Sequence, residues 1–255
     1  MSSTGEALSH EDRMLDDTVI AVPHGTLDAS TYRQLRDHLT KLGTDHPRAV
    51  VVDLDGLDIA TAGPLAIFTT VHLRLMQWPG VPLLLAGGND RSRKLLAASA
   101  IGRFVPVHDT IAGAVDSVDD PPPRKTHRTV LPSSMKSPRI ARELVRRTCV
   151  EWGMNGLVDD AVLIANELVS NAVVHTPSEP GIRIELRRDL FSVAVYDGVP
   201  GKVYLLEPDS GGYTVHGLLL VAQLATAWGC APTSAGGKVV WATIRSAPRH
   251  RPDQG

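Results

Sequence analysis

Hydrophobic residues follow two alternating patterns in the first part of the chain. Between residues 18 and 118, short apolar runs alternate with longer segments in which apolar residues are spaced three or four apart. The predicted strands cover residues 19–22, 49–53, 82–86 and 104–105, and the predicted helices cover residues 29–42, 64–76, 90–99 and 111–118. Regular alternation of this kind predicts an α/β domain with helices packed on a sheet. The preceding residues, 1–17, are polar and are predicted to be flexible.

The second part of the chain, residues 132–246, begins with two predicted helices and continues with strands. In each helix, apolar residues at spacings of three and four form one face that can be buried. These residues are Ala141, Leu144, Val145 and Trp152 in the first helix, and Val162, Leu163, Leu168, Val169, Ala172 and Val173 in the second. Residues 181–187 and 191–195 alternate apolar and polar side chains, which predicts two half-buried antiparallel strands. Residues 238–244 are predicted to form another strand.

The second of these helices carries a row of polar residues along one side. Glu167, Asn171 and His175 are four residues apart and therefore lie on one side of the helix. A carboxylate one turn from a carboxamide suits a site that holds a hydrated metal ion and accepts a proton from an attacking hydroxyl. The alternative is a polar stripe on a half-exposed helix, and for His175 an interaction with the helix C-terminus is favoured.

Two glycine-containing segments follow. Asp197 ends a predicted strand, and Gly198 and Gly201 come directly after it, where they allow the backbone to approach a ligand closely. Gly217 and Leu218 begin an apolar helix whose N-terminus can face a phosphate. The alternatives are that Asp197 forms an Asx turn and that Gly217 is a packing glycine. His216 is interpreted as a loop or lid residue.

In order and spacing, Glu167-x-x-x-Asn171, Asp197-Gly198-x-x-Gly201 and Gly217-Leu218 resemble the N, G1 and G2 boxes of the histidine-kinase-type ATPase superfamily. In detail, residues 128–246 are similar to the bacterial anti-sigma-factor serine kinases. The resemblance implies a two-layer α/β sandwich of the Bergerat type that binds ATP and Mg²⁺.

The resemblance also implies roles for individual residues. Asn171 would coordinate Mg²⁺, Glu167 would be the general base toward a serine of a partner protein, and Asp197 would accept a hydrogen bond from the adenine amino group. Neighbouring residues would bring the backbone close to the nucleotide: Gly198, Gly201, Gly217 and Leu218. Two positions depart from the family pattern, because Val215 replaces a glycine of the G2 box and Val239 lies where the last strand usually supplies a threonine. Both changes are expected to affect nucleotide affinity or turnover more than the fold.

Residues 15–118 resemble a STAS domain, the fold of anti-sigma-factor antagonists. The resemblance depends on three segments in order, residues 25–28, 51–56 and 84–88. In that family a phosphorylatable serine begins the helix after the second of these segments. Here the aligned residue is Ala62, which has no hydroxyl group. Thr61 is the only hydroxyl-bearing residue among residues 61–64, and we interpret it as a helix N-cap.

Between the two domains, residues 119–131 contain three consecutive prolines and are predicted to be a semi-rigid linker. Residues 247–255 are predicted to be a flexible tail. The formal net charge of −2, without a basic block, disfavours direct nucleic-acid binding. Cys149 and Cys230 match no metal-binding spacing and fit a reduced cytoplasmic protein. We expect no signal segment and no membrane span.

The two resemblances together imply a cytoplasmic regulator of bacterial transcription that acts by partner switching, in which an ATP-dependent anti-sigma-factor kinase is fused to an antagonist-like STAS module. The expected partners are a sigma factor, antagonist proteins with a STAS domain, or both, together with an intramolecular contact between STAS domain and kinase. Homodimerisation is left open. The alternative is a non-catalytic adaptor in which nucleotide is structural or absent. A sensor histidine kinase is disfavoured, since no dimerising helix pair with a phosphoacceptor histidine precedes the ATPase segment.

Overall fold

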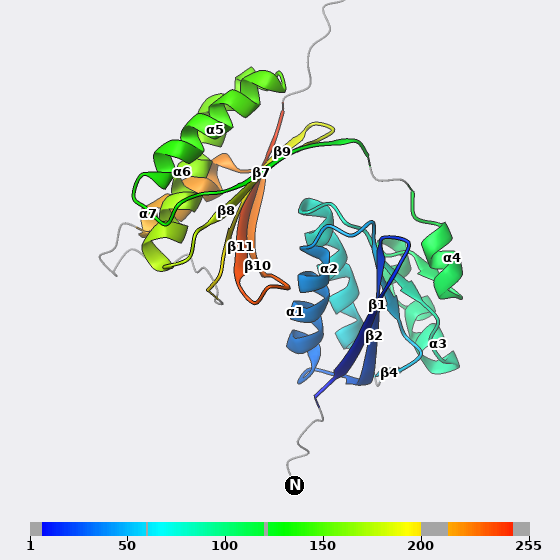
Figure 1. The fold of residues 1–255 in the computed structure, drawn as a ribbon. Coiled ribbons are helices and arrows are strands. Elements are labelled where there is room, and N and C mark those ends of the chain that lie inside the picture. The colour runs from blue at the N-terminus through cyan, green and yellow to red at the C-terminus, as the bar shows by residue number, and fades with distance from the viewer. Residues whose placement is uncertain (1–6, 60, 120–121, 200–213, 247–255) are drawn as a thin grey trace, which may run out of the picture. The chain divides into compact units, whose positions relative to one another are not determined.

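The computed structural model describes residues 7–59, 61–119, 122–199 and 214–246, with the side chains of residues 214–216 left out (Figure 1). The chain divides into two compact units, Met1–Pro121 and Pro122–Gly255. Each unit has its own sheet and its own buried apolar residues.

The first unit is built on a six-stranded sheet with the order β1-β2-β3-β5-β6, in which β4 also pairs with β2. The antiparallel pair β1–β2 is followed by parallel pairs. The strands are β1 (Ser9–Leu15), β2 (Thr18–Leu27), β3 (Val50–Asp53), β4 (Leu57–Ile59), β5 (Leu83–Ala86) and β6 (Val107–His108). The predicted α/β layer is confirmed in this unit.

Helices cover both faces of the central strands in this unit. They are α1 (Tyr32–Gly43), α2 (Ala66–Gln77), α3 (Asp90–Ala98) and α4 (Ile111–Asp116), with the 3₁₀ turns η1 (Gly63–Leu65) and η2 (Ile101–Arg103). Val50 and Val52 pack with α1 and α2, whereas Val51 packs with α4. An uninterrupted apolar run therefore marks a strand that is buried on both faces.

Two details of the first unit differ from the predictions. Residues 9–15, predicted to be flexible, form β1, which pairs with β2 in a continuous antiparallel register. Most side chains of β1 are exposed, so the strand is held by its backbone and shows no apolar alternation. The strand predicted at residues 104–105 lies at Val107–His108 instead.

The second unit has a five-stranded antiparallel sheet with the order β10-β11-β9-β8-β7. Its helices pack on one face of this sheet, which makes two layers (Figure 1). The strands are β7 (Arg124–Val130), β8 (Gly181–Arg187), β9 (Leu190–Asp197), β10 (Ala227–Pro232) and β11 (Lys238–Arg245), and the helices are α5 (Ser137–Glu151), the 3₁₀ turn η3 (Asn155–Leu157), α6 (Val158–His175) and α7 (Thr214–Leu224).

Alternation along the strands fixes which side chains meet the helices of the second unit. The core rows are Ile182, Ile184 and Leu186 on β8, Phe191, Val193 and Val195 on β9, and Val240, Ala242 and Ile244 on β11. By the same alternation, Asp197 and Lys238 continue these rows on the helix-facing side. Both residues therefore lie at one end of the space between the sheet and the helices.

The predicted linker, residues 119–131, is shorter in the structure. Arg124–Val130 forms β7 and pairs along its whole length with β8, so it belongs to the second unit. Strand β10 was also absent from the predictions. Helix α5 ends at Glu151, and Gly153, with a φ of 72°, allows the chain to turn away after it.

Within the described ranges, every helix is too short or too polar to cross a lipid bilayer.

The contact between α1 and α2 allows a test of the packing in the first unit. A Cβ atom on Gly43 would lie 2.4 Å from Leu75 Cδ2, so Gly43→Ala should lower the free energy of unfolding by about 1–3 kcal/mol. The matched change Gly102→Ala has no atom within 4 Å of the new Cβ and should change it by less than about 0.5 kcal/mol. Urea unfolding, with hydrogen exchange of peptides from residues 7–119 as the readout, measures the free energy of unfolding of the first unit in both variants. Equal effects of the two changes would contradict the close contact.

Candidate functional site

Helix α6 positions Glu167 and Asn171. The helix buries Ile164, Ala165, Leu168, Val169 and Ala172 against the sheet and its neighbouring helices. Glu167 and Asn171 lie beside this buried stripe and are half-buried. The predicted helix is confirmed, but Leu163, predicted in its buried face, is 42% exposed. The two polar side chains lie one turn apart at the boundary of the core.

The Glu167 carboxylate is enclosed on two sides. Its Oε1 accepts a hydrogen bond from Asn166 Nδ2 at 2.8 Å, and Arg142 on α5 donates to the Asn166 carboxamide oxygen. Its Oε2 faces Gly217 on α7, where a Cβ atom would lie only 2.2 Å away. Glycine at 217 therefore leaves the space that the carboxylate fills, and α7 packs directly against the predicted base.

Helix α7 begins earlier than predicted. Its first residue is Thr214, so Gly217 is inside the first turn and Val215 is also helical. The β-branched residue at 215 therefore needs no positive φ in this structure. Leu218, predicted to bind ATP, is 2% exposed and packs in the core of the unit. The helix turns the Leu218 side chain toward the core, so the part of this residue that the prediction assigns to the nucleotide is its backbone.

Asn171 keeps its carboxamide available. Within residues 122–199 and 214–246, its side chain makes no hydrogen bond, although it is half-buried. A carboxamide oxygen in this state fits a magnesium ligand, since Mg²⁺ takes few protein ligands and completes its shell with water and phosphate oxygens. Among the described residues, no group of three or more His, Cys, Asp or Glu side chains could hold a metal ion.

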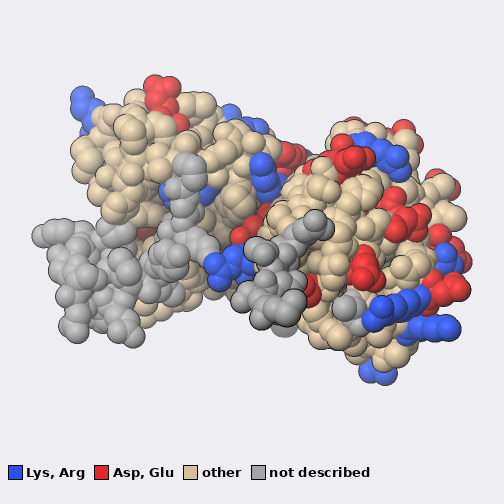
Figure 2. Space-filling view, turned by 90° about the horizontal axis from the view of Figure 1, so that it is seen from below, with Lys and Arg blue, Asp and Glu red and all other residues tan. Residues whose placement is uncertain are grey.

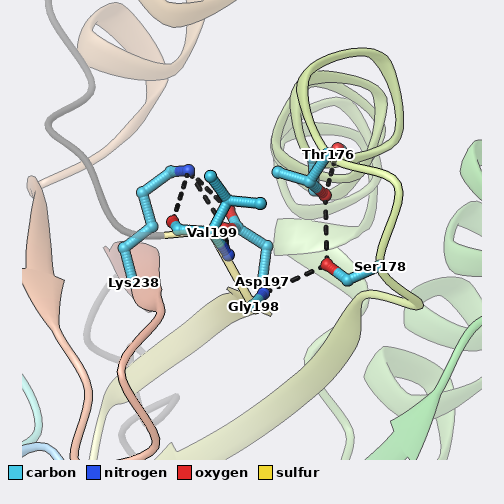
Figure 3. A network of polar contacts seen from close by, with 7 residues as sticks. Thr176, Ser178, Asp197, Gly198, Val199 and Lys238 are labelled. Atoms are coloured by element: carbon cyan, nitrogen blue, oxygen red, sulfur yellow. Dashed lines mark hydrogen bonds and ion pairs between the residues drawn. The ribbon is translucent and has the colours of Figure 1, made fainter.

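Asp197 is held by Lys238 at the end of the sheet (Figure 3). The Lys238 Nζ lies 3.0 Å from each oxygen of the Asp197 carboxylate and donates to the Val199 carbonyl at 3.2 Å. The Val199 amide donates to Asp197 Oδ1 at 3.0 Å. Only 3% of the Asp197 side chain and 11% of the Lys238 side chain are exposed, so this is a buried ion pair.

A short chain of hydrogen bonds joins the end of α6 to the turn after Asp197 (Figure 3). The Gly198 amide donates to Ser178 Oγ at 3.1 Å, and the Ser178 hydroxyl donates to Thr176 Oγ1 at 3.3 Å. The Thr176 hydroxyl in turn donates to the Ala172 carbonyl at 2.9 Å. This chain links the backbone of α6, one residue after Asn171, to the backbone directly after Asp197.

The predicted site residues are thus brought together in two groups. Glu167 meets Gly217, while hydrogen bonds through Thr176 and Ser178 link the helix turn that follows Asn171 to Gly198. Gly201 and the side chain of His216 lie outside the described residues, and His175 is exposed in the last turn of α6.

Lys238 was missed by sequence reasoning, which had singled out its neighbour Val239. In the structure Lys238 is directly opposite Asp197, whereas Val239 pairs with Tyr196 and points to the other face of the sheet. Val239 therefore does not share a face of the sheet with Asp197, the residue predicted to recognise adenine. The sequence showed a lysine at the first position of a predicted strand. Its place opposite Asp197 depends on how β11 pairs with β9, which a local pattern does not reveal.

In the first unit, Ala62 is exposed at the N-cap position of η1, and no side chain caps this turn. The predicted N-cap role of Thr61 is therefore wrong, since Thr61 precedes the cap and is exposed. A cavity of about 480 Å³ lies beside this turn, lined by Ala29, Tyr32, Arg33, Arg36, Gly63 and Pro64.

In the view of Figure 2, acidic and basic side chains are interspersed on the visible face of the first unit. Long-range attraction of a polyanion to this face is weak, because opposite charges at short spacing cancel.

No family model matches the chain, and no curated protein sequence matches it. Several solved structures match part of the chain. An anti-sigma-factor antagonist from Mycobacterium paratuberculosis is 18% identical, with a TM-score of 0.41, over 47% of this chain and 100% of that one. The phosphorylated form of SpoIIAA, a cell fate determinant from Bacillus, is 17% identical, with a TM-score of 0.33, over 44% and 100%. The unphosphorylated form is 17% identical, with a TM-score of 0.36, over 43% and 96%.

Each of these solved structures covers less than half of this chain. At these identities and TM-scores, the likeness assigns no activity, ligand or partner to this protein.

The bridge between α6 and the Asp197 turn can be tested at Ser178. Ser178→Ala removes one acceptor and one donor and should lower the free energy of unfolding of the second unit by about 0.5–1.5 kcal/mol. Ser170→Ala is the matched control, because Ser170 is also half-buried and has no hydrogen bond to a described residue. Hydrogen exchange should show faster exchange at the Gly198 amide only in Ser178→Ala. Unchanged protection there would argue against the bridge.

Proposed function

We propose that this protein regulates bacterial transcription by partner switching, with the second unit acting as an ATP- and Mg²⁺-binding serine-kinase-like module and the first as an antagonist-like module. The observation that supports the proposal is the chain of hydrogen bonds from the Gly198 amide, directly after Asp197, through Ser178 and Thr176 to the Ala172 carbonyl, directly after Asn171. Glu167 lies one turn before Asn171 on the same helix.

Each residue of the site has a distinct task in this proposal. Asn171 offers its carboxamide oxygen to Mg²⁺, and bound Mg-ATP would supply the phosphoryl group. Glu167 is a half-buried carboxylate that would accept the proton from a serine hydroxyl of the partner protein. The hydrogen bond from Asn166 and the close approach of Gly217 keep this carboxylate in one place, which supports a positioned base.

The first unit would act as an antagonist without a phosphorylation switch. Ala62 has no hydroxyl group, so this position cannot accept a phosphoryl group as the serine of related proteins does. The candidate partners of the protein are a sigma factor, free-standing STAS proteins, or both. Covalent connection to the second unit would raise the effective concentration of an intramolecular STAS partner, if the connection permits docking. We place the protein in the cytoplasm.

A second candidate is a non-catalytic adaptor, which one observation favours. The Lys238 ammonium already forms an ion pair with the Asp197 carboxylate, which is the group that would recognise adenine. In an adaptor, both units would bind partner proteins, and Glu167 would have no catalytic role.

The two candidates differ in nucleotide binding and in phosphoryl transfer. Calorimetric titration of ATP and ADP, with and without Mg²⁺, should show stoichiometric binding that depends on the metal. Mg-ATP should then support transfer to a free-standing STAS protein that carries the acceptor serine. Nucleotide binding without transfer to any STAS protein would favour the adaptor, and no nucleotide binding at all would exclude the kinase.

The base is tested by Glu167→Gln. This change keeps the size of the side chain and removes its basic oxygen, so transfer should fall by at least about a hundredfold while ATP affinity changes by less than about twofold. Glu143→Gln, at an exposed glutamate on α5, is the control and should leave both unchanged. Full transfer activity in Glu167→Gln would remove Glu167 from the proposed chemistry.

The missing acceptor is tested by Ala62→Ser. Because Ala62 is exposed, the new hydroxyl is accessible, and incubation with Mg-ATP should place phosphate at position 62. Ala66→Ser, at an exposed position one turn later, should remain unmodified. Peptide mapping by mass spectrometry reads out both. Phosphate on Thr61 of the wild-type protein would show instead that this hydroxyl is the acceptor.

A further inference from the structure

We propose that Lys238 controls the recognition of adenine, because its ammonium group occupies the Asp197 carboxylate to which the 6-amino group of the base would donate. This inference rests on the proposed nucleotide site of the second unit. It makes Lys238 a specificity-determining residue and predicts a nucleotide site that binds purine nucleotides without selecting for adenine.

The geometry of the ion pair leaves little room for a second donor. Nζ is 3.0 Å from both carboxylate oxygens and therefore lies between them, where it takes the inner lone pair of each oxygen. The Val199 amide takes a further lone pair of Oδ1, and the Val199 carbonyl accepts from Nζ. The donors of the ammonium thus have partners on two residues.

Burial makes this pair costly to separate. With 3% of the Asp197 side chain and 11% of the Lys238 side chain exposed, water cannot readily replace either partner. Separating a buried pair leaves a charge without compensation, which is strongly unfavourable. Adenine would have to displace Lys238 to reach Asp197, and the favourable hydrogen bond to the base would be offset by that loss.

The fold places Lys238 at this point through the backbone. Lys238 is the first residue of β11 and is directly opposite Asp197 in the register with β9. At the preceding residue, Gly237, a Cβ atom would lie 1.9 Å from the Asp197 carbonyl oxygen. This close approach fits only glycine, and it fixes where β11 begins beside β9. The ion pair is therefore a consequence of strand register and not of a flexible side chain alone.

Two probes separate recognition of the 6-amino group from the rest of nucleotide binding. They are ATP and purine riboside 5′-triphosphate, which lacks that amino group, each titrated with Mg²⁺ into the full-length protein. The readout is the ratio of the two affinities. Both probes carry the same triphosphate, so the effect of protein charge on the triphosphate cancels in this ratio. In the wild-type protein the two affinities should differ by less than about twofold.

The variant Lys238→Met keeps an unbranched apolar side chain and removes the ammonium. Asp197 then becomes available to adenine, and the ratio should shift toward ATP by roughly tenfold or more, as expected for a hydrogen bond to a charged group. Arg183→Met is the control for loss of a buried ion pair. Arg183 and Glu185 lie 2.7 Å apart in the same unit with 15% and 5% of their side chains exposed, and this change should leave the ratio as in wild type.

The outcomes are distinct. Equal wild-type affinities together with ATP preference in Lys238→Met support the inference. Wild-type preference for ATP of tenfold or more overturns it, since adenine would then reach Asp197 despite Lys238. This wild-type measurement decides the matter even where Lys238→Met does not fold. A folded Lys238→Met with a ratio near one also overturns it. If neither protein binds either triphosphate, the proposed nucleotide site fails, and this inference fails with it.

Discussion

The register between β9 and β11 is the constraint on which the second unit depends. It directs Val195 and Val240 together toward the helices, and at the end of the same rows it places Asp197 beside Lys238. A shift of one residue would exchange the two faces and expose the apolar rows. The order of the core and the chemistry of the candidate site therefore follow from one set of backbone hydrogen bonds. Gly237 supports this register, because any side chain there would meet the Asp197 backbone.

Helix α6 connects that core to the candidate site. Its apolar face is packed against the sheet, and its boundary carries Glu167 and Asn171 in half-buried positions. Beyond its last turn, Thr176 and Ser178 carry hydrogen bonds across to the strand end. Two kinds of interaction thus hold the helix, namely burial along its length and polar contacts at its end. A rigid helix of this kind suits residues that must hold a defined geometry.

Local patterns in the sequence predicted the elements with strong periodicity and missed those without it. The spacing of apolar residues located α6, and the apolar run of residues 49–53 located β3, because burial of side chains determines both. Strands β1 and β7 have mostly exposed, polar side chains and are held by backbone pairing, which leaves no periodic signal. The same limit applies to the site. Glu167 and Asn171 lie on one helix and could be predicted together, whereas the pairing of Lys238 with Asp197 depends on a partner 41 residues away.

Strands β1 and β7 also affect how copies of the protein can associate. Each lies at one margin of its sheet, where unpaired backbone groups can recruit a strand from another molecule. Both carry charged side chains, such as Glu11 and Arg13 on β1 and Lys125 and Arg128 on β7. Such charges disfavour the addition of a further strand, because the incoming chain would have to desolvate them. These margins are therefore protected against edge-to-edge aggregation.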